Sequence, residues 1–186
     1  MSDNAKQERF ERLVLPHMDA AYSLAVWLLR NESHAEEAVQ DACLRALRFF
    51  GGFRGEDARP WLLGIVRNTC YTMLARARQS GAPEEFDEVS HGEDAIAPGA
   101  VLNFPVNPEA AAIESADREL VHRCLGSLPA EFREALVLRE IHGCSYREIA
   151  AVTDAPIGTV MSRISRGRRL LERALTGPLE RKETGT

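Results

Sequence analysis

The segment from His142 to Leu175 constrains the fold most, because it predicts two short helices joined by a tight turn. Its sequence is HGCSYREIAAVTDAPIGTVMSRISRGRRLLERAL. Ser145 and Glu148 form a capping box, in which the serine hydroxyl accepts a hydrogen bond from the backbone N–H of Glu148 and the carboxylate accepts one from the N–H of Ser145. Pro156 suits the start of the second helix, where no backbone N–H is needed. We therefore expect the break between the helices at residues 153–155.

The second of these helices has an apolar side and a basic side when its residues are placed 100° apart. The apolar side comprises Ile157, Val160, Ile164, Leu171 and Ala174. Five arginines and a single acid lie between Ile157 and Arg173, a charge density suited to phosphate contacts. This pattern predicts a helix-turn-helix whose second helix enters a major groove. The alternative is an αα-hairpin whose arginines only face solvent.

The net charge of −5 conceals an uneven distribution along the 186 residues. Residues 81–118 contain nine acids and one base, whereas residues 59–78 contain four arginines and no acid. Two basic segments are therefore separated by an acidic connector, and an acidic chain can still bind nucleic acid.

The cysteines and the hydropathy exclude several classes of protein. The four cysteines form no CxxC pair, so we expect incidental thiols on helices, with no metal site and no cofactor. No apolar run is long enough to cross a bilayer, and the N-terminal sequence is too polar for a signal peptide. These features predict a cytoplasmic protein without membrane insertion.

Helical periodicity predicts an all-α chain, with two small helical domains joined by a flexible acidic linker. One helix is expected from Arg9 to Arg30, and a second is expected to follow a capping box at Ser33–Glu36 and to run to Phe50. A third is expected over residues 59–79. The predicted buried stripe of the second helix is Ala38, Val39, Ala42, Leu44, Leu47 and Phe50.

After the linker, Asn107 and Pro108 suit the start of a helix over residues 109–125. The sequence EFREALVLREI predicts a further helix. Its expected core residues are Phe132, Ala135, Leu136, Leu138 and Ile141.

Two stretches, in the right order and at the right distance, resemble the same family. AEEAVQDACLRAL, followed by FRGEDARPWLLGIVRNTCYTMLARAR, is similar to region 2 of the sigma-70 family. LPAEFREALVLREIHGCSYREIAAVTDAPIGTVMSRISRGRRLL is similar to region 4. The chain therefore resembles an extracytoplasmic-function (ECF) sigma factor, which keeps only these two regions. The resemblance implies region 2 over residues 1–79, a linker over 80–107, region 4 over 108–176 and a polar tail over 177–186.

This resemblance implies a non-enzymatic protein that binds core RNA polymerase, directs it to promoters and helps to open promoter DNA. The implied partners are the β′ clamp helices and the β flap of the polymerase, promoter DNA and a cognate anti-sigma factor. The runner-up is a stand-alone helix-turn-helix regulator, which would not need the region 2 motifs. The sequence contains no Gly-rich phosphate loop, HExxH or nucleophile elbow that would support an enzyme.

Opening DNA requires a surface with aromatic pockets beside positive charge, which binds unpaired bases. We assign the segment from Phe53 to Tyr71 to the minus-ten element, with Asn68 as a candidate reader of bases. Its candidate DNA-binding residues are Phe53, Arg54, Arg59, Trp61, Arg67, Asn68 and Tyr71. For Trp61, ordinary core packing is the favoured interpretation.

Region 4 is expected to read the minus-thirty-five element as duplex DNA. Its candidate residues are Thr159, Ser162, Arg163, Arg166, Arg168 and Arg169. Arg163 or Arg166 could contact guanine, whereas Arg168 and Arg169 are expected on phosphates. Gly167 costs about 1 kcal/mol relative to alanine inside a helix, which close approach to a neighbour would explain.

The family places its contact with the clamp helices on the second helix. Gln40 and Asp41 match the Gln-acid pair of that motif, and Glu37 and Arg45 flank them. The alternative for these four residues is a solvated helix face.

Overall fold

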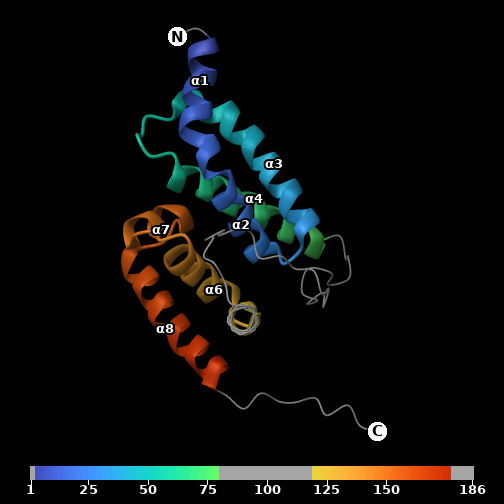
Figure 1. Ribbon diagram of the computed structural model, residues 1–186, viewed down its shortest axis with the longest axis vertical. Coiled ribbons are helices and arrows are strands. Elements are labelled where there is room, and N and C mark those ends of the chain that lie inside the picture. Colours follow the sequence, from blue (N-terminus) through green and yellow to red (C-terminus); the bar gives the residue numbers. More distant parts are fainter. Residues whose placement is uncertain (1–2, 80–118, 177–186) are drawn as a thin grey trace, which may run out of the picture.

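Helices account for all the regular structure in residues 3–79 and 119–176, the part of the chain that the computed structural model describes (Figure 1). The first lobe contains α1 (Asp3–Val14), the 3-10 turn η1 (Leu15–His17), α2 (Met18–Leu29), α3 (Glu32–Phe49), the 3-10 turn η2 (Phe50–Gly52) and α4 (Arg59–Gln79). The second lobe contains a helix over residues 119–126, then α6 (Ala130–Leu136), the π-helical turn η3 (Val137–Ile141), α7 (Tyr146–Thr153) and α8 (Ile157–Thr176). The prediction of an all-α chain with two helical domains is confirmed. The predicted linker, the predicted helix start at Asn107 and the predicted tail lie outside the described residues.

Pro16 interrupts the first predicted helix, so the prediction of a single helix from Arg9 to Arg30 is wrong. Helix α1 ends at Val14 and α2 begins at Met18, with Pro16 inside η1. Proline has no backbone N–H, and its ring clashes with the carbonyl four residues earlier. The chain therefore forms two helices in place of one.

The start of α3 also differs from the prediction, because Asn31 caps this helix. The Asn31 side chain accepts a hydrogen bond from the backbone N–H of His34 at 2.9 Å. Ser33 lies inside the first turn, so the predicted capping box at Ser33–Glu36 is wrong. Asparagine caps helices as well as serine does, and the extended backbone of Asn31, with a φ of −146°, marks the start of the helix two residues earlier.

Small residues form the buried stripe of α3, namely Ala35, Ala38, Val39, Ala42 and Ala46. Burial is confirmed for Ala38, Val39, Ala42 and Phe50. Leu44 and Leu47 are 68% and 43% exposed, so their predicted burial is wrong. The alanines recur every three or four residues and fix which side of the helix faces α2 and α4, and this phase turns both leucines outward.

A π-helical turn changes the pattern of burial in the second lobe. Burial is confirmed for Ala135, Leu136 and Leu138, and Phe132 is half-buried. Ile141 is exposed, contrary to the prediction. The N–H of His142 donates to the carbonyl of Val137, five residues earlier, at 3.0 Å. The extra residue in this turn shifts the helical phase, and Val137 is buried while Ile141 is not.

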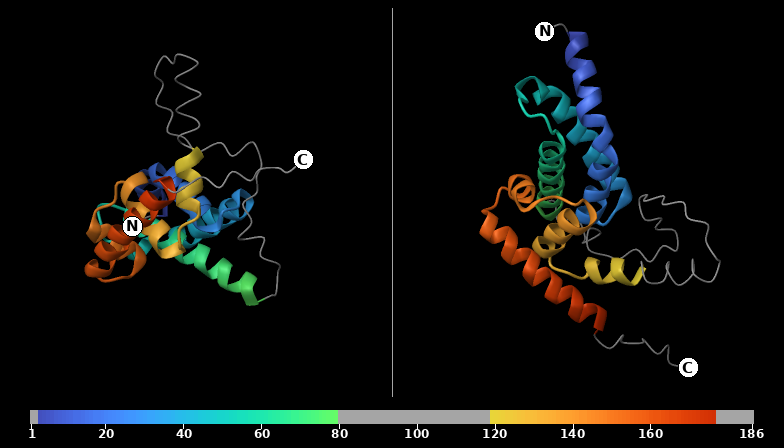
Figure 2. Two further views of the ribbon diagram at one scale, coloured as in Figure 1. Left: turned by 90° about the horizontal axis from the view of Figure 1, so that it is seen from below. Right: turned by 60° about the vertical axis from the view of Figure 1, so that its left-hand side comes forward.

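Helix α4 joins the two lobes, and its predicted span over residues 59–79 is confirmed. It packs against α2 and α3 of the first lobe and against α7 of the second (Figure 1). The buried side chains of both lobes form one continuous hydrophobic core, from Phe10 to Ile164. Helix α8 lies at the outer edge of the second lobe in both Figure 1 and the right-hand view of Figure 2. One long face of α8 is therefore left uncovered by the other helices that the structure describes.

Candidate nucleic-acid interface

Helices α7 and α8 form the predicted helix-turn-helix. The capping box is confirmed: the Ser145 hydroxyl accepts from the N–H of Glu148 at 3.2 Å, and the Glu148 carboxylate accepts from the N–H of Ser145 at 2.6 Å. These hydrogen bonds lower the pKa of Glu148. Asp154 ends α7 in the left-handed conformation, with a φ of 48°, and α8 begins at Ile157. The break therefore lies at residues 154–156, one residue later than predicted, and Pro156 directly precedes the first helical residue.

One side of α8 packs tightly on α6. Val160, Ile164 and Gly167 are buried. A Cβ added at Gly167 would lie 3.1 Å from Cδ1 of Leu136 and 3.3 Å from the carbonyl oxygen of Phe132, which confirms the close approach predicted for this glycine. Leu171 and Ala174 are half-buried on the same side. Ile157 is exposed, contrary to the prediction, because it lies in the first turn, where no helix of the described residues covers it.

The opposite side of α8 carries most of the predicted minus-thirty-five residues. Ser162, Arg166 and Arg169 are exposed, and Thr159 and Arg163 are half-buried. Arg168 is exposed but forms an ion pair of 2.7 Å with Glu140 of η3. Sequence reasoning missed Met161, which is 52% exposed and lies one turn after the exposed Ile157. Its position at i+4 from Ile157 was the signal that could have found it.

Two aromatic residues of the predicted minus-ten segment, Phe53 and Trp61, pack inside the first lobe. Phe53 is buried, and its ring lies 5.8 Å from that of Phe50 and 4.9 Å from that of Trp61. Trp61 is half-buried against the core, as its favoured interpretation expected. Phe53 thus supports the loop after η2 from inside, while Arg54 is exposed on it.

Three other residues of that segment lie against the second lobe. The Nε of Arg67 lies 2.6 Å from Oε1 of Glu134 on α6, and the guanidinium carbon stands 4.6 Å from the centre of the Tyr71 ring. Arg59 donates a hydrogen bond to the carbonyl of His142. Asn68, which follows Arg67, is exposed. These contacts could not be predicted from the sequence, because the partners are 67 and 83 residues apart.

Burial controls the titration of the groups at this contact. Burial raises the pKa of Glu134, although the hydrogen bond and charge of Arg67 and the charge of Arg163 act to lower it. Burial and the charge of Glu134 raise the pKa of Tyr71 to about 12. Burial and the charge of Arg59 lower the pKa of His142 to about 4. At neutral pH the contact therefore holds a neutral histidine and an uncharged tyrosine beside the Arg67–Glu134 ion pair.

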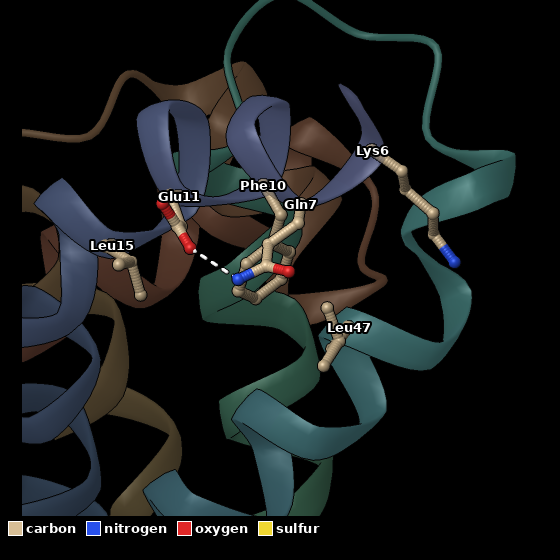
Figure 3. Close-up of a pocket in the computed structure, with 6 residues that line it drawn as sticks. All are labelled: Lys6, Gln7, Phe10, Glu11, Leu15 and Leu47. Atoms are coloured by element: carbon tan, nitrogen blue, oxygen red, sulfur yellow. Dashed lines mark hydrogen bonds between the residues drawn. The ribbon is translucent and has the colours of Figure 1, made fainter. Parts of the chain in front are cut away.

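The four residues predicted to bind polymerase lie together on α3. Glu37 and Gln40 are exposed, and Asp41 forms an ion pair of 2.7 Å with Arg45. Exposed apolar side chains adjoin them at Leu44, Leu47 and Phe49. Leu47 also lines a shallow pocket between α1 and α3, beside Phe10 and Leu15 (Figure 3).

The described residues hold no cluster of three or more His, Cys, Asp or Glu side chains that could bind a metal ion. Cys43 is half-buried and the other three cysteines are buried. Among the helices that the structure describes, none combines the length and the apolar character needed to cross a membrane.

Comparisons with known proteins match most of both lobes. The model for Sigma-70 region 2 matches residues 13–80, and the model for Sigma-70, region 4 matches residues 118–171. The chain is 34% identical over 168 residues to the RNA polymerase sigma-H factor of Pseudomonas aeruginosa, covering 89% of this chain and 86% of that protein. It is also 34% identical over 167 residues to the ECF RNA polymerase sigma-E factor of Escherichia coli K12, with the same two coverages of 89% and 86%.

Solved structures agree with these sequence relatives. The sigma factor RpoE, in its complex with the anti-sigma factor NepR from Bartonella quintana, is 28% identical with a TM-score of 0.68 and covers 92% of this chain and 99% of that one. The structure of CnrH in complex with the cytosolic domain of CnrY is 26% identical with a TM-score of 0.60, covering 91% of this chain and 88% of the other.

Proposed function

Given that the chain belongs to the extracytoplasmic-function sigma factors of the sigma-70 family, and is thus an alternative sigma factor that directs RNA polymerase to promoters, we propose that its two lobes divide this task. The second lobe reads the minus-thirty-five element as duplex DNA. The first lobe holds the polymerase and captures the minus-ten element. The observation that supports this proposal is the basic face of α8. This helix is the second of the capped helix-turn-helix, lies at the edge of the molecule, and has this face uncovered by the other described helices.

On α8, Arg166 is the best candidate for the bidentate contact to guanine. Arg166 is exposed and has no ion-pair partner among the described residues, whereas Arg163 is half-buried beside Glu134. Arg168 already forms an ion pair with Glu140, whereas Arg169 is exposed, so Arg169 is the proposed phosphate contact. Ser162 and Thr159 lie on the Arg166 side of the helix, within reach of the same groove.

Ile157 and Met161 add an apolar strip to the N-terminal half of α8. Both side chains are exposed and lie one turn apart. Apolar side chains contact the C5-methyl group of thymine in a major groove. We therefore assign this strip to one or two thymines of the minus-thirty-five element.

In the first lobe, α3 is the proposed contact with the β′ clamp helices. Glu37, Gln40, Asp41 and Arg45 supply polar groups, and Leu44 supplies apolar surface beside them. Leu44, Leu47 and Phe49 are all exposed beside these polar groups, and an apolar patch rimmed by polar residues marks a protein interaction surface. The β flap is the proposed partner of the second lobe.

The segment from Phe53 to Tyr71 is proposed to capture unpaired bases of the minus-ten element. Arg54 and Asn68 are exposed and available. Arg59, Arg67 and Tyr71 supply the charge and the aromatic ring that single-stranded DNA requires, while Phe53 and Trp61 support the segment from the core.

The regulatory partner is proposed to be an anti-sigma factor, because both solved relatives were obtained as complexes, one of them with a protein described as an anti-sigma factor. The protein acts in the cytoplasm as an initiation factor, without catalytic activity of its own. The sequence homology to whole sigma factors, which extends over both lobes, disfavours a stand-alone regulator.

The test is transcription from genomic DNA in vitro, with core polymerase and this protein, followed by mapping of the transcript starts. We expect a holoenzyme on gel filtration, and starts that share two upstream motifs. The matched variant Arg166→Ala should still form the holoenzyme but lose the starts that depend on the upstream motif. Failure to form a holoenzyme, together with tight binding of duplex DNA by the protein alone, would favour the regulator.

A further inference from the structure

The loop over residues 53–58, between η2 and α4, begins the segment that is proposed to capture the minus-ten element. Phe53 and Ala58 at its two ends are buried. The exposed residues between them are Arg54, Gly55, Glu56 and Asp57. At the α4 end, Oδ1 of Asp57 accepts a hydrogen bond from the backbone N–H of Arg59 at 2.9 Å. The loop is therefore an exposed turn that is anchored on the α4 side.

Arg9 of α1 anchors the other end of this loop, 44 residues away along the chain. Its Nη1 donates a hydrogen bond to the carbonyl oxygen of Phe53 at 3.3 Å. Its guanidinium carbon also lies 5.1 Å from the centre of the Phe50 ring and 5.9 Å from the centre of the Phe53 ring. A guanidinium is planar and carries several N–H donors, so one group can contact aromatic rings and a carbonyl together. Arg9 thus ties α1 to the start of the loop.

The carbonyl that Arg9 binds belongs to the peptide between Phe53 and Arg54. The N–H of Phe53 donates to the carbonyl of Phe50 at 3.0 Å, so both backbone polar groups of Phe53 are bonded. Because a peptide unit is planar, holding its oxygen also fixes where the Cα of Arg54 lies. Arg9 therefore sets the direction in which the chain enters the exposed part of the loop.

Gly55 rests directly on the ring of Phe53. A Cβ added at Gly55 would lie 2.8 Å from Cζ and 3.0 Å from Cε2 of that ring. The ring cannot move aside freely, because it packs against the rings of Phe50 and Trp61 at 5.8 and 4.9 Å. The middle of the loop is thus seated on the same aromatic cluster that Arg9 holds.

We propose that Arg9 is a positioning residue for minus-ten recognition, which holds the 53–58 loop in the conformation that reads a base without touching DNA itself. This inference rests on the proposed function. Arg9 is half-buried and bound to the Phe53 carbonyl, whereas Arg54 on the loop is exposed to DNA. A reading group is effective only when its supporting contacts fix its geometry. The alternative, a direct phosphate contact by Arg9, would act on all promoter sequences alike.

The test uses the holoenzyme on one mapped promoter, in which each minus-ten position carries each of the four bases in turn. Arg9→Met keeps an apolar stem but removes the donor and the charge. Open-complex formation should lose about three- to ten-fold of its base preference at one or two adjacent positions, the worth of one well-placed hydrogen bond. Preferences at the other positions and the affinity for core polymerase should not change. Arg12→Met, at an exposed arginine of the same helix, is the matched control and should leave every preference unchanged.

Unchanged base preferences in Arg9→Met would overturn the inference. An equal loss of open complexes at every position would also overturn it, because a phosphate contact or general instability acts in that way. A parent holoenzyme without any minus-ten preference, or a parent protein that forms no holoenzyme, would instead overturn the proposed function. The two failures are therefore distinguishable.

A second variant tests the same loop with Arg9 intact, in case Arg9→Met folds poorly. Gly55→Ala forces the loop away from the Phe53 ring, so it should weaken the base preference at the same positions as Arg9→Met. Gly52→Ala, whose Cβ would meet nothing within 4 Å, is the control and should behave as the parent. Parent-like preferences in Gly55→Ala would overturn the inference.

The conformation of the loop can also be measured in the free protein by NMR relaxation. The order parameter of the Gly55 N–H should fall from about 0.85 in the parent to below about 0.6 in Arg9→Met, while the N–H groups of α4 keep their values. Equal order parameters for Gly55 in the two proteins would show that Arg9 does not hold the loop, and would overturn the inference.

Discussion

Gly167 of α8 and Leu136 of α6 lie so close that a Cβ at Gly167 would be 3.1 Å from both Cγ and Cδ1 of the leucine. Leu136 is fully buried and the Phe132 carbonyl, at 3.3 Å, belongs to a helix backbone, so neither neighbour can move freely. Gly167→Ala should therefore destabilise the protein by about 1–2 kcal/mol, because overpacking outweighs the gain in helix propensity. Urea unfolding measures this. Gly158→Ala, which meets nothing within 4 Å, should be neutral or stabilising, and a stabilised Gly167→Ala would contradict the packing argument.

Removal of the capping hydroxyl should destabilise the helix-turn-helix. Ser145→Ala leaves the N–H of Glu148 without its partner, at a cost of about 1 kcal/mol in the free energy of unfolding. The pKa of Glu148, which is lowered by the Ser145 hydrogen bonds, should rise toward its ordinary value in the variant. Carboxylate titration by NMR would check this, with Ser165→Ala on the exposed side of α8 as the control. An unchanged pKa of Glu148 in the variant would contradict the capping box of Ser145 and Glu148.

His142 should make stability depend on pH. Because burial and Arg59 lower its pKa to about 4, the folded protein disfavours the charged imidazole. The contribution is complete above the ordinary pKa near 6.5 and is lost as pH falls toward 4, by about 2–3 kcal/mol. Burial raises the pKa of Glu134, which acts in the opposite direction, so the comparison must be between the parent protein and His142→Gln. Urea unfolding at pH 7, 5.5 and 4.5 should show a shallower fall in the variant, and parallel curves would exclude His142 as the source.

Leu44 should contribute to polymerase binding without contributing to folding. Its side chain is 68% exposed on α3, so Leu44→Ala should change stability by no more than about 0.5 kcal/mol. At the centre of an interface the same truncation should cost about 1–2 kcal/mol, roughly ten-fold in affinity for core polymerase. Fluorescence titration with core polymerase measures this, and Leu175→Ala, an exposed leucine at the end of α8, is the control. Equal affinities of the two variants for core polymerase would show that Leu44 is not at the centre of the interface.

Arg166 and Arg169 should differ in what they recognise. Arg166→Ala should cost about 1–3 kcal/mol on the matched duplex and relax base preference at one position. Arg169→Ala should weaken all duplexes alike and reduce the salt dependence by about one phosphate contact. Anisotropy titrations on the mapped promoter and a shuffled duplex separate the two effects. Loss of discrimination in Arg169→Ala instead would exchange the two roles.

Local sequence patterns predicted much of this molecule correctly. The capping box of Ser145, the span of α4 and the packing of Gly167 depend on residues a few positions apart, or on the general cost of glycine in a helix. Errors arose where two local signals competed. Asn31 and Ser33 are both residues that can cap a helix, and Asn31 caps α3. Leu44 is apolar enough for the buried stripe, but the buried alanines set the helical phase and leave it exposed.

Helical periodicity and capping were enough to establish two helical lobes and the basic face of α8, because these properties depend on neighbours within about one turn. The partners of Arg59 and Arg67 were decided only by the tertiary structure. Sequence chemistry presented Arg67 as a free charge for DNA, but a free arginine and one bound to Glu134 have the same local sequence. Their contact depends on how one lobe packs on the other, and α7 lies against α4 because apolar side chains of both helices are buried in one core.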